Sequence, residues 1–171
     1  MPSQLRATTL RYLEGTNILE TTFATASGVL VTTDFMPIQK RQDLHPAGQD
    51  VTSERRIVRL LRCTRGSVAC VLEMKPTFGF ATEQVALIAS EDGALVFQGR
   101  NDTLHVHGPS PWVQSAGQVS ATLRLRAGDV VPLVLTYAKR DAEVTSFNLD
   151  VAQRALEETR TYWEEWSQAC T

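Results

Sequence analysis

Alternation of apolar and polar residues dominates the chain up to about residue 138, in short runs separated by glycine-containing turns. A period of two is typical of strands that bury one face in an antiparallel sheet. In one such run the apolar residues of a single face are Val68, Cys70, Leu72 and Met74, and Pro76 ends the run. The pattern predicts about ten short strands over this part of the chain.

An Arg-Gly pair ending at Gly66 separates the run 57–63 from the run 67–75. Glycine readily adopts the positive φ that a two-residue hairpin turn requires. The sequence therefore predicts a hairpin, and in its register Cys63 and Cys70 are diagonal neighbours on one face. We interpret both thiols as small core residues rather than as a disulfide or a catalytic nucleophile.

Further runs predict the rest of the sheet. Three of them, separated by short polar turns, predict a meander of strands at 85–89, 94–98 and 103–107. The run 119–126 predicts a half-buried strand. The run 130–137 is more continuously apolar and suits a central strand, with Pro132 at its start or at a bulge. The segment 38–53 is polar and has no period, so we expect a long loop there.

The period changes near the C-terminus, where apolar residues recur at spacings of four and three. The residues of this stripe are Ala152, Leu156, Thr159, Trp163, Trp166 and Cys170. They predict an amphipathic helix with Asp150 as its N-cap. The two tryptophans bring a large apolar area that must be buried against something. The fold class predicted is mainly β: an antiparallel β-sandwich at 1–148, followed by an amphipathic linker helix at 149–171.

Composition and charge exclude several classes of protein. The 171 residues are 43% hydrophobic, which is enough for one sizeable core. The net charge of −2 comes from 17 basic and 19 acidic residues with no long basic run, which argues against nucleic-acid binding. No run reaches the roughly 20 apolar residues of a membrane span, and the N-terminus lacks the order of a secretory signal. With only three cysteines, we expect a cytoplasmic protein without a disulfide framework.

Several short strings occur together in this chain. They are Thr16-Asn17-Ile18-Leu19-Glu20-Thr21, Thr33-Asp34-Phe35-Met36-Pro37, the stretch 59–66 with Cys63, Pro76-Thr77-Phe78, and Thr161-Tyr162-Trp163-Glu164-Glu165-Trp166. In this order they resemble the N-terminal domain of glycoside hydrolase family 15 proteins of the bacterial glucoamylase and trehalase-like type. The chain departs from the family after Phe78, where it has Gly79 and Phe80 in place of an aspartate and a tyrosine.

The resemblance implies a supersandwich-like domain joined by a helical linker to a separate (α/α)6 barrel. In the family that barrel carries two catalytic glutamates. The resemblance therefore implies that this chain is a non-catalytic half, with no catalytic, cofactor-binding or metal-binding residues of its own. Its expected partner is the barrel, and α-glucan or trehalose would be bound through it.

The candidate substrate-proximal or interface residues are Thr16, Asn17, Asp34, Arg59, Trp163 and Trp166. Asp34 can order a turn through backbone N–H groups, or it can face the barrel or its substrate entrance. Arg59 shares a predicted strand face with Ile57, so its charge needs solvent or a carboxylate. We hypothesise a buried or interfacial ion pair of Arg59 with Asp34 or with Glu20.

Other groups of polar or aromatic residues are interpreted as structural. The glutamates 157, 158, 164 and 165 lie beside arginines on the predicted helix, as on a solvated face, although glycoside cleavage does need two carboxyl groups. His105 and His107 share a strand face without a third metal ligand nearby. Trp112 could stack on a sugar ring or plug a sheet edge, and we favour the plug.

Two other classes of function are alternatives. A stand-alone carbohydrate-binding module would carry a row of exposed aromatic residues on one sheet face. An assembly domain would dimerise through the stripe that contains Trp163 and Trp166, since uncovered apolar surface and strand edges favour association.

Overall fold

The structure is a computed structural model that describes residue 2 and residues 4–40, 51–53, 55–89, 94–115, 117–140, 142, 144–145 and 147–169. Its strands are β1 (Leu5–Tyr12), β2 (Leu19–Thr25), β3 (Gly28–Phe35), β4 (Ile38–Lys40), β5 (Val51–Ser53), β6 (Arg56–Met74), β7 (Ala86–Ala89), β8 (Leu95–Gln98), β9 (Asp102–His107), β10 (Val113–Ser115), β11 (Gln118–Arg126) and β12 (Val130–Lys139). A short 3-10 turn, η1 (Gly79–Ala81), follows β6, and one helix, α1 (Leu149–Ala169), ends the described chain.

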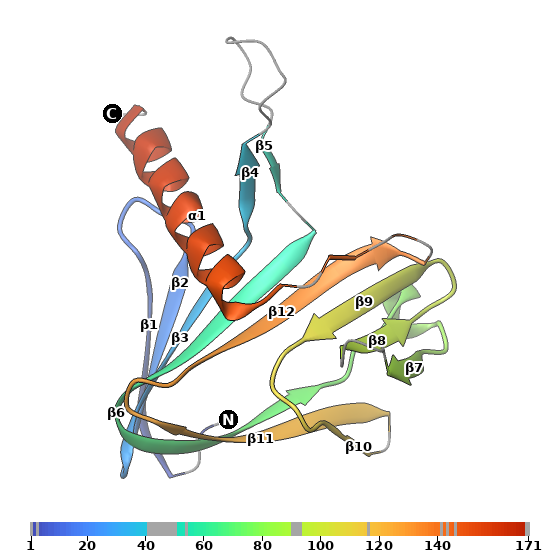
Figure 1. Ribbon diagram of the computed structural model, residues 1–171, viewed down its shortest axis with the longest axis horizontal. Helices are drawn as coiled ribbons and strands as arrows, with labels where there is room; N and C mark the ends of the chain where they lie inside the picture. The colour runs from blue at the N-terminus through green and yellow to red at the C-terminus, as the bar shows by residue number, and fades with distance from the viewer. Residues whose placement is uncertain are drawn as a thin grey trace.

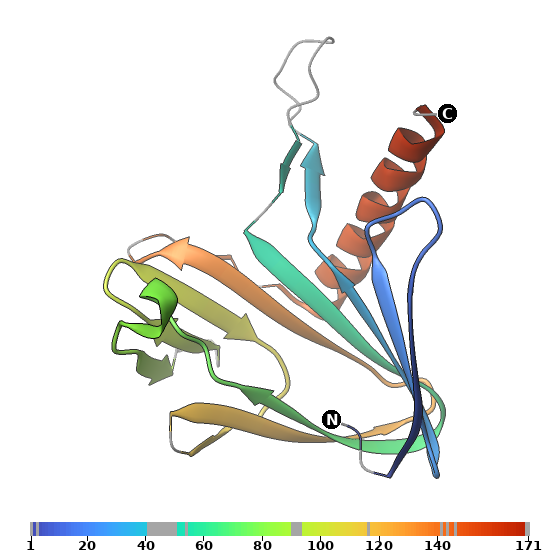
Figure 2. The ribbon, with the colours of Figure 1, turned by 180° about the vertical axis from the view of Figure 1, so that it is seen from behind.

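Ten of the strands form one antiparallel sheet that folds back on itself. Eight lie in the order β1-β2-β3-β6-β12-β9-β8-β7, and β11 joins through the second half of β6 and carries β10. Figures 1 and 2 show β11 and β10 running beneath β12 and β9, so the sheet has an upper and a lower arm. The predicted mainly β, antiparallel fold with a C-terminal helix is confirmed, and the layers of the sandwich are the two arms of one sheet.

The predicted hairpin around Gly66 is wrong, because 56–74 is a single strand of 19 residues. Gly66 has a φ of +65° and lies opposite Gly28 of β3. A β-carbon at Gly66 would collide with the carbonyl oxygen of Ser27, so only glycine fits where the two strands approach. The positive φ bends β6 instead of reversing it. Cys63 and Cys70 are nevertheless both buried and free, as expected of core residues.

The two halves of β6 pair with different strands. The half before the bend lies between β3 and β12, and the half after it pairs with β11. The meander is confirmed, since β7, β8 and β9 are consecutive antiparallel neighbours. β12 is central, between β6 and β9, and Pro132 lies near its start, two residues before pairing with β9 begins at Val134.

The segment 38–53 is not simply a loop, because its ends pair. β4 and β5 form a separate two-stranded sheet, and 41–50 lie outside the described residues. Such short pairing rests on backbone hydrogen bonds and leaves no apolar period to detect in the sequence.

Two cores lie on the two faces of the upper arm. The inner core fills the space between the arms; its buried members are Leu30, Leu61, Cys63, Val68, Cys70, Phe78, Phe97, Val106, Val119, Leu125 and Leu133. The outer core lies between the upper arm and α1; its buried members are Ile18, Phe35, Val58, Leu60, Val134, Phe147 and Ala152. The upper arm is therefore buried on its outer face by α1 and, in part, on its inner face by the lower arm.

The N-cap of α1 is Asn148, not the predicted Asp150. The side-chain oxygen of Asn148 accepts a hydrogen bond of 2.9 Å from the backbone N–H of Val151. Asp150 lies inside the first turn, where its negative charge still suits the positive end of the helix dipole. Asn148 caps the helix in place of Asp150 because its side chain reaches the N–H of the third helical residue, Val151.

Candidate functional site

The first half of α1 is held firmly on the sheet. Ala152 is completely buried against the outer core, and Leu156 packs beside it. Thr159 is also fully buried, and its hydroxyl oxygen accepts a hydrogen bond of 3.2 Å from the backbone N–H of Ile38. This contact ties the middle of the helix to β4 at the point where that strand starts.

The second half of α1 carries an aromatic cluster, formed by Tyr162, Trp163 and Trp166. The rings of Trp163 and Trp166 lie edge to face with centroids 5.7 Å apart, and Tyr162 packs edge to face on Trp163 at 5.3 Å. Trp166 is 53% exposed. In Figures 1 and 2 this end of α1 rises past the turn between β1 and β2. The stripe predicted from sequence is therefore buried at Ala152 and Thr159 and open to solvent at Trp166; Cys170 lies outside the described residues.

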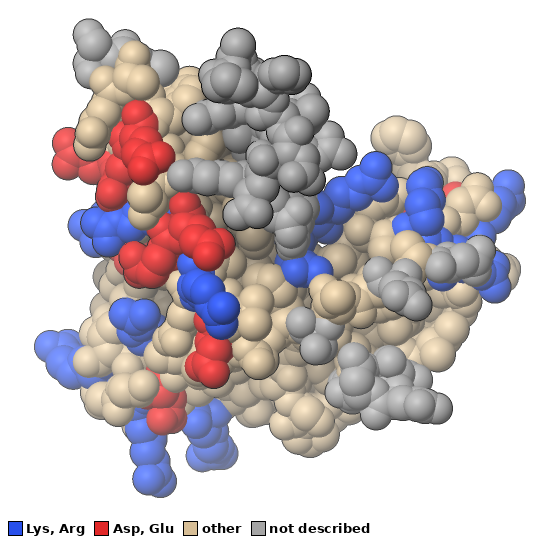
Figure 3. All heavy atoms as spheres, turned by 45° about the horizontal axis from the view of Figure 1, so that its top comes forward, with Lys and Arg blue, Asp and Glu red and all other residues tan. Residues whose placement is uncertain are grey.

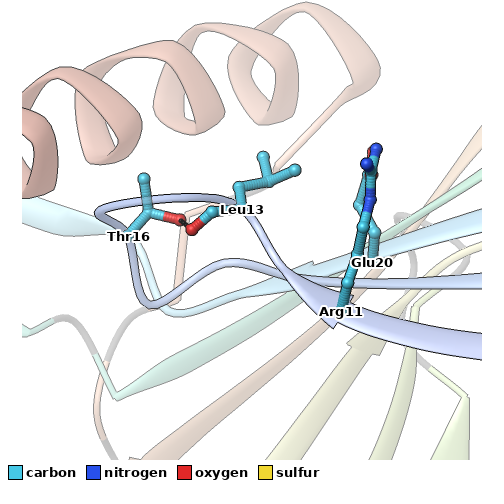
Figure 4. Close-up of polar contacts among 4 residues, drawn as sticks. All are labelled: Arg11, Leu13, Thr16 and Glu20. Atoms are coloured by element: carbon cyan, nitrogen blue, oxygen red, sulfur yellow. Dashed lines mark hydrogen bonds and ion pairs between the residues drawn. The ribbon is translucent and has the colours of Figure 1, made fainter.

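Thr16 holds the turn between β1 and β2 in shape. Its hydroxyl donates a hydrogen bond of 2.9 Å to the carbonyl oxygen of Leu13 (Figure 4), and it accepts one of 3.2 Å from the N–H of Ile18. Asn17, next in the chain, is exposed. A β-carbon at Gly15 would lie 3.5 Å from the hydroxyl oxygen of Ser167, so the turn lies against the second half of α1. The fold thus brings Thr16 and Asn17 near the helix end that carries Trp163 and Trp166.

A polar cleft of about 590 Å³ separates this turn from the helix. Its lining residues are Leu13, Glu14, Gly15, Glu20, Arg160, Glu164, Ser167 and Gln168. Nε of Arg160 lies 2.7 Å from the carboxylate of Glu164, and this hydrogen bond raises the pKa of Arg160. On the strand side of the cleft, Glu20 is paired with Arg11 at 2.7 Å (Figure 4).

The acidic residues of α1 lie on its solvated side, in agreement with the interpretation from sequence. Glu157, Glu158 and Glu165 are exposed, and Figure 3 shows carboxylates gathered over this part of the surface. Glu164 belongs to the ion pair with Arg160.

The partner of Arg59 is Asp34, as hypothesised, but the pair is not buried, since the Arg59 side chain is 46% exposed. The two residues lie opposite each other in the β3–β6 register, and the pair is bidentate, with nitrogen-to-oxygen distances of 2.6 and 2.8 Å. The hydrogen bond from Asp34 raises the pKa of Arg59. Glu20 is excluded as the partner because its own strand neighbour is Arg11.

The ion pair lies on the inner face of the upper arm, away from α1. Asp34 and Arg59 line a cleft between the two arms, hereafter the inter-arm cleft, whose volume is about 560 Å³. The next residue of β3, Phe35, belongs to the outer core under α1. The six candidate residues therefore separate into two groups: Thr16, Asn17, Trp163 and Trp166 near the helix end, and Asp34 with Arg59 on the other face of the sheet.

Two remaining sequence candidates have structural contacts. A ring nitrogen of His105 lies 3.2 Å from the hydroxyl oxygen of Thr103, which fits the structural interpretation of that histidine. Trp112 packs against the inner core, as the plug interpretation requires.

Sequence reasoning missed Arg56, which is only 8% exposed. Its Nε donates a hydrogen bond of 3.0 Å to the hydroxyl of Thr136, and its guanidinium lies 4.5 Å from the ring centroid of Phe147. These contacts tie the segment before α1 to the sheet, so Arg56 helps to position the helix. The available signal was its alternation with Val58 and Leu60, which places a charge on an apolar strand face.

Fold and site together define a mainly β domain whose single described helix carries a partly exposed aromatic cluster. No protein-family model matches the chain. It is 27% identical over 174 residues to a trehalase of Mycolicibacterium smegmatis, and 25% identical over 170 residues to a trehalase of Mycobacterium tuberculosis. Each match covers 91% of this chain and 25% of the relative.

The chain thus spans about a quarter of the length of the curated relatives it matches. Similarity of this extent fits a β-domain of a larger trehalase-like protein. Within the part of the chain that the structure describes, no helix is long and apolar enough to cross a bilayer.

Proposed function

We propose that this chain is the non-catalytic N-terminal domain of a glycoside hydrolase of the family 15 type, with trehalase or glucoamylase activity in the whole protein. The domain supports a separate (α/α)6 barrel, which carries the catalytic acid and base and binds trehalose or α-glucan. Support comes from the similarity to two trehalases along nearly the whole chain but along only a quarter of each trehalase.

The observation that carries the proposal is the uncovered aromatic cluster on the last turns of α1. Trp166 is 53% exposed and lies edge to face with Trp163, which leaves apolar surface in water that a packed neighbour would remove. The turn that contains Thr16 and Asn17 reaches the same end of the helix, since its Gly15 lies against Ser167. We assign Thr16, Asn17, Trp163 and Trp166 to one docking face for the barrel.

Asp34 and Arg59 are not assigned to this docking face. Both oxygens of Asp34 accept hydrogen bonds from Arg59, and the pair lines the cleft on the face of the sheet away from α1. In this proposal the pair links β3 to β6 at the mouth of the inter-arm cleft. We also propose a cytoplasmic location, because Cys63 and Cys70 are free thiols.

The same cluster favours a second candidate function, assembly through Trp163 and Trp166. A carbohydrate-binding module has less support. The exposed aromatic residues in the described part of the chain are Tyr12, Phe80, Tyr137 and Trp166, which lie on β1, η1, β12 and α1. Four different elements do not make a row on one sheet face.

Enzyme assays with the purified chain test the first part of the proposal. We expect no hydrolysis of trehalose, maltose or soluble starch, because the acid and base belong to the barrel. Measurable turnover that co-purifies with the folded chain would overturn it.

A chimera tests the docking face. In it, this chain replaces the aligned quarter of the M. smegmatis trehalase. The Trp163→Ser/Trp166→Ser double variant of the chimera is compared with Tyr12→Ser, which removes an exposed aromatic side chain from β1. We expect the chimera to hydrolyse trehalose. We expect a lower thermal midpoint for the double variant and not for Tyr12→Ser. Equal midpoints would contradict the docking face. If the isolated chain is a dimer and the same double variant is a monomer, assembly is favoured. Retardation of the isolated chain on a glucan column would favour a binding module.

A further inference from the structure

Phe80 is an unusual residue of the surface because it is fully exposed on a left-handed backbone. Its relative exposure is 105%, and Gly79, Phe80 and Ala81 have consecutive φ values of +54°, +55° and +67°. A left-handed conformation costs a residue other than glycine about 1–2 kcal/mol. Such strain persists where the surroundings impose it, and it is concentrated at functional positions. The domain thus holds a phenyl ring in water at a cost to its own stability.

The surroundings that impose this turn are well defined. Phe78 is buried in the inner core. The hydroxyl of Thr82 donates a hydrogen bond of 2.6 Å to the carbonyl oxygen of Gly79, and the carboxylate of Glu83 accepts one of 2.8 Å from the backbone N–H of Arg100. The turn is therefore anchored to the β8–β9 connection, and the ring of Phe80 lies in solvent.

The chemistry of the turn favours a protein pocket over a sugar. Recognition of a sugar ring requires free hydrogen-bonding groups beside the aromatic face. The hydroxyl of Thr82 and the carboxylate of Glu83 are already used inside the turn. What Phe80 offers outward is apolar area alone, which suits an apolar pocket of matching size.

The inter-arm cleft is such a pocket, and it belongs to this chain. Its apolar lining includes Phe23, Leu30, Leu61, Leu72, Leu133 and Leu135. Ile57 lines it too and is 48% exposed, so the cleft is open to a large side chain from outside. Phe80 does not fill the cleft of its own copy, since it is fully exposed.

Phe80 and the inter-arm cleft lie close together along the chain. Met74 lines the cleft, and η1 begins five residues later at Gly79. Around a two-fold axis, each ring can enter the cleft of the other copy, which closes the assembly at two. Charges agree with this arrangement, because exposed Arg100 accompanies the turn and exposed Glu73 lines the cleft.

We propose that Phe80 inserts into the inter-arm cleft of a second copy of this chain, and that reciprocal insertion forms a two-fold dimer. The interface lies on the inner face of the sheet and at the β8–β9 connection, whereas the proposed docking face for the barrel lies at the end of α1. The dimer therefore does not depend on the proposed function. Each phenyl ring contributes roughly 150–250 Å² of burial. Since stable interfaces need about 1,200–2,000 Å² in total, we expect a weak dimer with a dissociation constant in the micromolar range.

Sedimentation equilibrium of the purified chain tests the dimer over about 1–200 µM. We expect Phe80→Ser to weaken dimerisation at least tenfold, and Ile57→Lys to do the same by placing a charge in the mouth of the cleft. Trp166→Ser is the matched control and should leave the constant unchanged. Both test positions are exposed, so circular dichroism should show an intact fold. A monomer at every concentration, or a dimer weakened by Trp166→Ser and not by Phe80→Ser, would overturn the proposal.

A photo-crosslinker locates the pocket directly. The variant Phe80→p-benzoylphenylalanine is mixed with isotope-labelled wild-type chain and irradiated, and the joined peptides are identified by mass spectrometry. We expect crosslinks between copies to Ile57, Arg59 and Leu61 and to 70–74, which line the cleft. Crosslinks to any other surface, or only within one copy, would refute insertion into the cleft.

Discussion

The two faces of β6 arise from the same alternation of residues but are covered differently. On the side of α1, Val58 and Leu60 are 0% and 1% exposed. On the other side, Ile57 is 48% exposed and Arg59 needs Asp34 as its partner. The covered face stabilises the domain, and the open face leaves a cleft that another molecule can enter. Burial of a strand face is thus decided by what packs on it and not by its apolar pattern.

Coverage differs because the two covering layers differ in extent. α1 packs on the outer face through a fully buried small residue, Ala152, and Phe147 packs in the same core before the helix begins. The lower arm pairs with the second half of β6 and covers the inner face only in part, which leaves the inter-arm cleft.

The bend at Gly66 creates the inner face, so we expect Gly66→Ala to have the largest effect. The alanine would combine a left-handed backbone with a collision against the carbonyl oxygen of Ser27. We expect a loss of at least about 3 kcal/mol in the free energy of unfolding, measured by urea denaturation. Gly117→Ala is the control: its φ is +77°, but its β-carbon would meet no atom within 4 Å. A loss of about 1 kcal/mol is expected there, and equal losses at both positions would argue against the close approach of β3 and β6.

Truncation on each face of β6 compares the faces directly. Leu60→Ala removes a fully buried side chain under α1, and we expect a loss of about 2–5 kcal/mol in the free energy of unfolding. Ile57→Ala on the open face should cost less than about 1 kcal/mol, because much of that side chain is already in water. If the two variants unfolded at the same urea concentration, the inner face would be as well covered as the outer one.

The hydroxyl of Thr159 ties α1 to β4, and Thr159→Val removes it without changing the volume much. The N–H of Ile38 then loses its acceptor in a partly buried place, so we expect a loss of about 1–2 kcal/mol. Thr161→Val, on the exposed side of the same helix, serves as the control and should change stability by less than about 0.5 kcal/mol. Thermal denaturation of both variants measures the difference. A neutral Thr159→Val would mean that apolar packing alone holds the helix.

The smallest effect is expected at a solvent-exposed pair outside both faces. Asp102 of β9 lies opposite Lys139 of β12, and its carboxylate is 2.7 Å from the ammonium group. Hydrogen bonds from Lys139 and then from Tyr137 lower the pKa of Asp102. Its contribution to stability is therefore present above the ordinary pKa of aspartate, about 3.9, and is lost as the pH falls through the lowered value. Between about pH 5 and pH 2, the wild type should lose slightly more stability than Asp102→Asn. Parallel curves of urea midpoint against pH for the two proteins would contradict this assignment.

The pair of Asp34 and Arg59 shows how far the candidate site could be predicted. An arginine that alternates with Ile57 and Leu61 on a strand face needs a carboxylate, and this need is visible in the sequence. The choice between Asp34 and Glu20 was not visible, because it depends on the register of β3 against β6. The separation of this pair from Thr16, Asn17 and the tryptophans by the thickness of the sheet was equally hidden, since alternation does not tell which face a helix will cover.

Local properties of the sequence are enough to specify the antiparallel strands, the C-terminal helix and the position where β6 needs glycine. Each rests on a period of two, a period of 3.6 or a positive φ. The tertiary structure alone decided that Gly66 bends the strand and does not reverse it. A positive φ permits both outcomes. The choice depends on which strands satisfy the backbone hydrogen bonds of each half, and these partners, β3, β11 and β12, lie far away along the chain.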